Sequence, residues 1–149
     1  SKMFNDEWMR VNGFFDDDTE PTAADILSGR ENAVIWAEAT QTLHDVSTML
    51  REKGISQVPV KDTSGALCGT VSERKILNAL VSGTSPEMKV ASISEGGLPV
   101  LHPQTNIGKI NESLLSNSAV LIGTAPEVSA IEGILTRIDI IEYLEQHRA

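Results

Sequence analysis

A repeated pattern constrains the fold of this chain more than any other feature of its sequence. The pattern Gly-x-(Val/Leu)-(Ser/Thr)-x-x-x-Ile-(Leu/Ile) occurs at residues 69–77 and again at residues 133–141, which are 64 positions further along. Residues 38–43 and 102–107 form a second matching pair at the same spacing. A fixed long period indicates a duplicated supersecondary unit, so we expect two copies of one small fold.

The predicted elements follow the same order in both copies. In the first copy we expect a short helix at 23–27, strands at 33–36, 56–60 and 67–71, and helices at 43–53 and 73–80. In the second copy we expect a short leading segment at 90–93, strands at 99–101, 119–122 and 130–135, and helices at 107–115 and 138–146. Strands joined through a helix predict a parallel pair, and the hairpin that follows adds an antiparallel strand. The predicted fold class is therefore α/β, with two β-α-β-β-α repeats related by pseudo-two-fold symmetry.

Two strand residues carry further expectations. Pro59 lacks a backbone N–H, which indicates an edge strand or a backbone that faces a ligand. Cys68 is the single cysteine and stands among apolar residues, so we expect a small buried core residue rather than a reactive thiol. A single cysteine also excludes a disulfide within the chain.

The charge balance narrows the classes of partner. The chain has 12 basic and 21 acidic side chains and a formal charge of −9, which argues against nucleic acids and anionic membranes. The sequence shows neither an apolar run near the ~20 residues of a membrane span nor a secretory signal, so we expect a cytoplasmic location. His44, His102 and His147 lack metal-ligand spacing, so no metal site is predicted.

Residues 1–21 do not belong to the repeat. They contain apolar residues spaced for one helical face, Trp8 among them, followed by an acidic linker. This arrangement is typical of the last helix of a larger protein, cut at this point. The expected divisions are a tail at 1–21, a first domain at 22–83 and a second domain at 84–149.

Two segments resemble a known family. Residues 53–60 (Lys-Gly-Ile-Ser-Gln-Val-Pro-Val) and residues 133–139 (Gly-Ile-Leu-Thr-Arg-Ile-Asp) resemble the signature segments of CBS-domain pairs, also called Bateman modules. The resemblance covers roughly residues 22–149. Residues 1–9 are similar to the last helix of the catalytic core in the cystathionine β-synthase family. Together with residues 50–54, they make the chain resemble the C-terminal regulatory region of that family.

The resemblance implies a regulatory fragment without catalytic residues. In that family pyridoxal phosphate (PLP) belongs to a separate catalytic domain, and residues 1–21 would be the end of that domain and its linker. The implied partners are this catalytic domain, an adenosyl small molecule that acts as effector, and a second copy of the chain in a homodimer.

The resemblance also implies a ligand site around the second copy of the pattern. The family holds a ribose with a hydroxyl and a carboxylate, here Thr136 and Asp139, and a carboxylate can accept two hydrogen bonds from a vicinal diol. The adenine would lie against Ala33 and Ile35, and Ile138 would pack on its ring. The backbone that reads the adenine edge is implied at Ile55, Ser56, Gln57 and Val58.

The same residue types have a simpler interpretation. Thr136 and Asp139 also fit a capping box, in which the two side chains satisfy free amides at a helix start. The two roles can coexist. In the first copy Ser72 can cap its helix, but Lys75 stands at the position of Asp139 and cannot accept hydrogen bonds from a diol. We therefore expect the cleft of the first copy, at Ser72 and Lys75, not to bind an adenosyl ligand.

Three functions remain open. The first is a sensor of S-adenosylmethionine that controls an attached PLP-dependent cystathionine β-synthase in transsulfuration. The second is a ligand-free assembly module, in which apolar helix residues pack between chains: Ile76, Leu77, Leu80, Ile140, Ile141 and Leu144. The third is a sensor of AMP, ADP or ATP, with Arg74, Lys75 and Arg137 near the phosphates. The net charge of −9 mildly favours a sulfonium cation over a polyanion.

Overall fold

The computed structural model describes residues 20–30 and 33–147, which form two compact units. The first-repeat unit contains residues 35–98 and 126–129, and the second-repeat unit contains the described residues of 20–34, 99–125 and 130–147. The helix predicted around Trp8, and with it most of the expected tail, lies outside the described residues.

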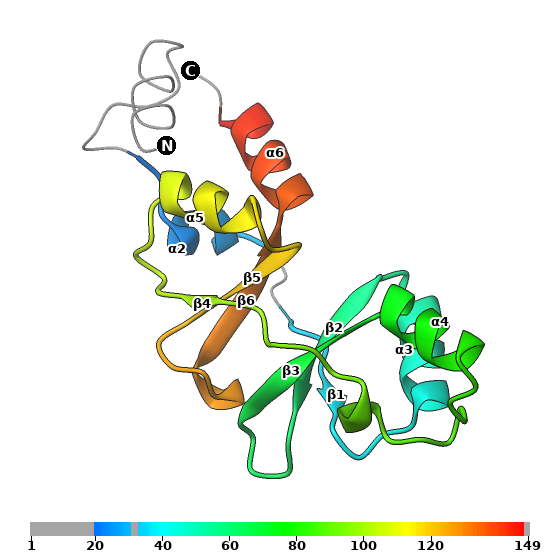
Figure 1. Cartoon of the computed structure of the whole chain (residues 1–149). Helices are drawn as coiled ribbons and strands as arrows, with labels where there is room; N and C mark the ends of the chain where they lie inside the picture. The colour runs from blue at the N-terminus through cyan, green and yellow to red at the C-terminus, as the bar shows by residue number, and fades with distance from the viewer. Residues whose placement is uncertain (1–19, 31–32, 148–149) are drawn as a thin grey trace. The chain divides into compact units, whose positions relative to one another are not determined.

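The first-repeat unit is built on a three-stranded sheet. Its elements are β1 (Ala37–Glu38), α3 (Leu43–Lys53), β2 (Gln57–Lys61), β3 (Leu67–Ser72), α4 (Glu73–Val81) and the 3₁₀ helix η2 (Val90–Ser92). The strand order is β1-β2-β3, with β1 parallel to β2 and β2 antiparallel to β3. Figure 1 shows α3 and α4 side by side next to this sheet.

The second-repeat unit has the same plan. Its elements are α2 (Ala23–Leu27), β4 (Val100–Leu101), α5 (Ile107–Leu114), β5 (Ala119–Gly123), β6 (Ile131–Thr136) and α6 (Arg137–Gln146). The 3₁₀ helix η3 (Val128–Ala130) directly precedes β6 in the chain. The order is β4-β5-β6, again with one parallel and one antiparallel pair. The predicted α/β fold with two β-α-β-β-α repeats is therefore confirmed.

Helix α3 shows how the sequence sets the ends of an element. The Oγ1 of Thr42 accepts a hydrogen bond from the N–H of Asp45 at 3.0 Å, and the Asp45 carboxylate accepts one from the N–H of Thr42 at 3.2 Å. Gly54 ends the helix with a φ of 64°, a left-handed conformation that costs glycine little. Both ends agree with the positions predicted from the sequence.

Each unit has its own apolar core beneath its sheet. The first core contains Leu43, Val46 and Leu50 of α3, Val58 and Val60 of β2, Val71 of β3 and Ile76 of α4, together with Ala37 and Val90. The second core contains Ile107, Ile110 and Leu114 of α5, Val120 and Ile122 of β5, Leu135 and Ile140, together with Ala23, Ile26 and Leu27 of α2.

The burial of two helix residues corrects a sequence prediction. Ile76 is 4% exposed and Ile140 is 7% exposed, so neither can pack between chains as the assembly hypothesis requires. Both residues lie on the face of their helix that packs into the core of their unit. The helix turns once every 3.6 residues, so the neighbouring apolar residues of the sequence lie on other faces.

Helix α2 packs in the second-repeat unit although it precedes the first repeat in the sequence. The carbonyl of Pro21 accepts a hydrogen bond at 2.9 Å from the N–H of Ile107, the first residue of α5. The first N–H groups of a helix have no partner within the helix, so this contact satisfies a donor that would otherwise need water. The side chains of Ile26 and Leu27 then complete the second core.

The segment before the second repeat makes the matching contact in the other unit. The carbonyl of Met88 accepts a hydrogen bond at 2.9 Å from the N–H of Leu43, the first residue of α3, and Val90 enters the first core. The leading segments of the two repeats are thus exchanged. The compact units consequently do not coincide with the sequence divisions at 22–83 and 84–149.

Cys68 is exposed, and the prediction of a buried core residue is wrong. Val60 pairs with Gly69 and Lys61 pairs with Leu67, so Cys68 is an extra residue at a register shift between β2 and β3. Such a β-bulge interrupts the alternation of inward and outward side chains. The apolar neighbours of Cys68 in the sequence therefore did not predict that its own side chain is exposed.

Two expectations about strands also require correction. Residues 33–36 have no regular structure, because the parallel pairing with β2 involves only Ala37 and Glu38. Pro59 lies in the central strand rather than at an edge. Its partner on β3 is Thr70, whose N–H and carbonyl both bond to the backbone of Glu95. Pro59 and Thr70 therefore form a non-hydrogen-bonded pair, and the missing N–H of the proline leaves no acceptor on β3 unsatisfied.

Among the described helices, none combines the length and the apolar character needed to cross a membrane. In the same part of the chain, no three His, Cys, Asp or Glu side chains gather as a metal-binding group.

Candidate functional site

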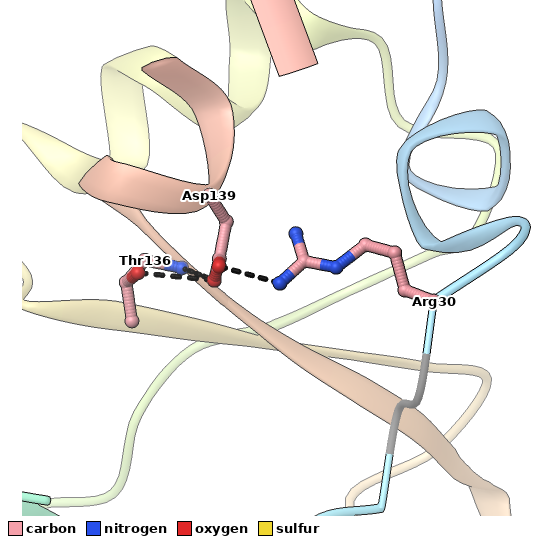
Figure 2. A network of polar contacts seen from close by, with 3 residues as sticks. All are labelled: Arg30, Thr136 and Asp139. Atoms are coloured by element: carbon pink, nitrogen blue, oxygen red, sulfur yellow. Dashed lines mark hydrogen bonds and ion pairs between the residues drawn. The ribbon is translucent and has the colours of Figure 1, made fainter. Parts of the chain in front are cut away.

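Asp139 lies in the first turn of α6, directly after the end of β6. One of its carboxylate oxygens, Oδ2, accepts a hydrogen bond from the N–H of Thr136 at 2.8 Å and another from the Thr136 hydroxyl at 3.0 Å (Figure 2). The predicted contact between these two side chains at the helix start is therefore formed. The carboxylate satisfies a free amide at the positive end of α6, which stabilises the helix.

The other oxygen of Asp139 is bound by Arg30, a residue that no sequence motif indicated. The Nη2 atom of Arg30 donates a hydrogen bond to Oδ1 at 2.6 Å, and Figure 2 shows the arginine side chain extending from the turn after α2 toward the carboxylate. The Asp139 side chain is 14% exposed and that of Arg30 is 35% exposed. No motif marks Arg30, because the contact depends on the packing of α2 in the second-repeat unit.

The Arg30–Asp139 pair lies at the wall of a pocket of about 420 Å³ within the second-repeat unit. The pocket is lined by the end of α2, by the turn that follows it and by α6: Asp25, Ile26, Ser28, Gly29, Arg30, Asp139, Glu142, Tyr143, Gln146 and His147. A volume in this range is sufficient for a small organic ligand.

The pocket is rich in charged and polar groups. The carboxylates of Asp25, Asp139 and Glu142 line it beside the guanidinium of Arg30. Tyr143 and His147 stack with ring centroids 4.0 Å apart and an angle of 12° between the planes. Burial raises the pKa of Tyr143, and the nearby Asp25 carboxylate raises it further, so the phenol remains a neutral hydrogen-bond donor at physiological pH.

Comparison with known proteins identifies the fold. Residues 23–82 match the family model described as the CBS domain. The CBS-pair protein CBSX2 from Arabidopsis thaliana superposes with a TM-score of 0.71 at 24% identity, over 86% of this chain and 96% of that one. A CBS domain-containing protein from Bacillus anthracis superposes with a TM-score of 0.71 at 23% identity, over 87% and 97% of the two chains. The chain has the fold of a CBS-domain pair.

Two further comparisons concern a named enzyme and a structure with a bound ligand. Cystathionine beta-synthase from Mus musculus is 26% identical over 128 residues, which are 82% of this chain but only 23% of the mouse protein. The chain therefore spans about a quarter of the length of this curated relative. A structure of CBSX2 in complex with AMP superposes with a TM-score of 0.67 at 24% identity, over 84% of this chain and 96% of that one. The resemblance inferred from residues 53–60 and 133–139 is thus confirmed at the level of the fold.

The residues predicted to bind a ligand divide between the two units of the chain. Thr136, Ile138 and Asp139 lie together at the start of α6, and Ile138 is 56% exposed. Ala33 belongs to the same unit and is exposed. The remaining predicted residues belong to the first-repeat unit: Ile35, Ile55, Ser56, Gln57 and Val58. A ligand role for this set stays a prediction.

The five predicted residues of the first-repeat unit differ in how much of each is exposed. The side chain of Val58 is fully buried in the core, so only its backbone can contribute to a site. Ile35 and Ile55 are half-buried against the same core. Ser56 is exposed, and its carbonyl accepts a hydrogen bond from the N–H of Glu73 at 2.9 Å, which holds the segment at the start of α4.

The equivalent position of the first repeat is occupied by an ion pair. The Oγ of Ser72 accepts a hydrogen bond from the N–H of Lys75 at 3.1 Å, so Ser72 caps α4 as predicted. The ammonium of Lys75 lies 3.3 Å from a carboxylate oxygen of Glu95. This position presents a hydrogen-bond donor where Asp139 presents an acceptor.

The cations proposed from the sequence for phosphate binding are placed differently from Arg30. The Nη2 atom of Arg137 donates a hydrogen bond to the carbonyl of Leu114 at 2.6 Å, so Arg137 holds the end of α5. Arg74 is exposed on α4, in the other unit. Arg30 is the cation that contacts Asp139 directly.

Proposed function

We propose that this CBS-domain pair is a regulatory module that binds an adenosyl compound, with S-adenosylmethionine as effector. The module would control an attached PLP-dependent cystathionine β-synthase of the transsulfuration pathway. The similarity to the mouse enzyme supports this assignment. The observation that carries the ligand proposal is the Asp139 carboxylate at the wall of a pocket that also contains Arg30 and two further carboxylates.

The two oxygens of the Asp139 carboxylate have different partners, which makes capping and ribose binding compatible. Oδ2 is held by the N–H and the hydroxyl of Thr136. Oδ1 faces Arg30 and is the oxygen that a ribose hydroxyl would approach. The helix cap can therefore persist while a ligand is bound.

The charges of the pocket suit the amino-acid end of S-adenosylmethionine. Arg30 offers a fork of N–H donors for a carboxylate. The carboxylates of Asp25 and Glu142 line the same pocket and would favour an ammonium or a sulfonium cation. A ligand with both signs of charge matches this lining better than a neutral nucleoside does.

Regulation requires that the effector bind two states of the module with different affinity. A typical coupling free energy of about 1–3 kcal/mol changes an equilibrium by roughly 5- to 150-fold. Binding to the isolated module and regulation of the enzyme are therefore separate measurements, and binding comes first.

Isothermal titration of S-adenosylmethionine into three proteins tests the ligand proposal. Asp139→Asn removes the charge while keeping the size of the side chain, and we expect it to weaken binding by about 1.5–3 kcal/mol, which is tenfold to more than a hundredfold. Asp45→Asn is the matched control, because Asp45 has the same capping position in α3 of the other unit. Equal affinity of the wild type and Asp139→Asn would reject Asp139 as a ligand residue.

A second candidate function is assembly into a homodimer, and the exposure of apolar side chains favours it. Leu77, Leu80 and Val81 on α4 are 59%, 40% and 79% exposed. Ile138 and Ile141 on α6 are 56% and 50% exposed. Large apolar side chains that gather on one helix face are typical of protein contacts. We propose a second copy of the chain as the partner.

An adenosine phosphate is the third candidate, and Arg30 is the observation that favours it. A guanidinium beside the proposed ribose carboxylate can bind a phosphate as well as a carboxylate. The structural relative in complex with AMP supports the same class of ligand. Titration with AMP under identical conditions separates this candidate from S-adenosylmethionine by their relative affinities.

A further inference from the structure

The hydrogen-bonding capacity of Asp139 limits how a ribose can bind. A carboxylate has about four lone-pair positions, two on each oxygen, and a third donor on one oxygen must share a position. The N–H and the hydroxyl of Thr136 fill both positions on Oδ2, and Arg30 fills one of the two on Oδ1. One position remains for a ligand.

A vicinal diol donates two hydrogen bonds and therefore needs two positions. It must displace either Thr136 or Arg30. Displacing Thr136 would open the cap of α6 and leave a helix amide unsatisfied. Displacing Arg30 breaks a contact that spans 109 residues and leaves the local structure of the helix unchanged.

We infer that Arg30 is a displaceable competitor at this site and that it selects ligands carrying an anionic group in addition to the diol. This inference rests on the adenosyl binding proposed above. Binding is then an exchange: the diol replaces the guanidinium on Asp139, and the anion of the ligand replaces Asp139 on the guanidinium. A neutral nucleoside can make only the first half of this exchange.

The burial of the two partners sets the size of the effect. The Asp139 side chain is 14% exposed and depends on protein or ligand partners. The Arg30 side chain is 35% exposed, so water can partly hydrate it after displacement. The penalty for a neutral ligand should therefore be on the order of tenfold in affinity rather than a complete loss of binding.

Titration of AMP, S-adenosylmethionine and adenosine into the wild type and Arg30→Gln tests the inference. The wild type should bind AMP and S-adenosylmethionine about tenfold more tightly than adenosine. In Arg30→Gln the affinity for adenosine should rise, the affinity for the two charged ligands should fall, and the preference should disappear. Arg51→Gln is the matched control, because Arg51 is an exposed arginine of the other unit, and it should keep the wild-type preference.

A second measurement uses the number of ligand hydroxyls. 2′-Deoxyadenosine has lost one hydroxyl of the diol and fits the single free position on Oδ1. The gain in affinity from 2′-deoxyadenosine to adenosine should therefore be small in the wild type and several-fold larger in Arg30→Gln, where Asp139 has two free positions.

The outcomes separate this inference from the proposed function. Binding that depends on Asp139, with the same ligand preference in the wild type and Arg30→Gln, would overturn the inference and leave the proposed function intact. An equal loss of all ligands in Arg30→Gln would assign Arg30 a purely structural role. Failure of every compound to bind either protein would overturn the proposed function and the inference together.

Discussion

At the scale of single residues, Asp139 combines a local and a long-range role. Its Oδ2 stabilises the start of α6 through Thr136, three positions away, and its Oδ1 pairs with Arg30, 109 positions away. The first role holds the carboxylate in a fixed orientation, and the second places one donor on its remaining oxygen. The bonds that stabilise the helix therefore also fix the orientation of the carboxylate that we propose as a ligand residue.

Cys68 provides a prediction at this scale. The thiol is exposed, but partial burial raises its pKa and the Asp62 carboxylate raises it further, so little thiolate is present at neutral pH. We expect Ellman's reagent to modify Cys68 completely in the native protein, more slowly than it modifies free glutathione. The rate should increase as the pH rises toward the raised pKa, and Asp62→Asn should accelerate it at neutral pH. A thiol that reacts only after denaturation would contradict the exposed position of Cys68.

At the scale of elements, the turn between β2 and β3 depends on one carboxylate. Oδ1 of Asp62 accepts hydrogen bonds from the N–H of Ser64 at 2.8 Å, the Ser64 hydroxyl at 2.6 Å and the N–H of Ala66 at 3.0 Å. The hydrogen bond from the Ser64 hydroxyl lowers the pKa of Asp62 most, and the backbone donors lower it further. The ionised carboxylate is therefore the form that stabilises the hairpin.

The lowered pKa fixes the direction of the pH dependence. A group whose pKa is lower in the folded state stabilises the fold above its unfolded pKa, and this contribution is lost as the pH falls through the folded pKa. We expect Asp62→Ala to lower the urea midpoint at neutral pH and to reduce its decline in acid. Glu127→Ala is a control from the same unit. Parallel declines of the wild type and Asp62→Ala in acid would exclude this role for Asp62.

The sequence predicted those elements whose determinants lie close together in the chain. Thr42 and Gly54 marked the ends of α3, and the spacing of Thr136 and Asp139 predicted the capping contact, because each signal acts within one helix. The position of Cys68 and the contact of Arg30 were not predictable in this way. The first depends on a register shift between two strands, and the second depends on packing between segments far apart in the sequence.

At the scale of the whole molecule, the exposed apolar residues of α4 provide a further prediction. Leu77 and Val81 are four residues apart and share one helix face. We expect the wild type to sediment as a dimer at micromolar concentration and the double variant Leu77→Ser with Val81→Ser to sediment as a monomer. Leu115→Ser is the control, since Leu115 is 73% exposed outside α4 and should leave the dimer intact. A monomeric wild type would reject the homodimer.

The exchange of leading segments has a consequence for the history of the chain. Pro21 contributes its carbonyl to α5 of the second repeat, and Met88 contributes its carbonyl to α3 of the first. In a chain that held one repeat, the same contacts would have to form between two molecules. The present chain corresponds to such a reciprocal pair with its two halves joined covalently. Gene fusion of an intertwined ancestor would therefore preserve every one of these contacts while making them independent of protein concentration.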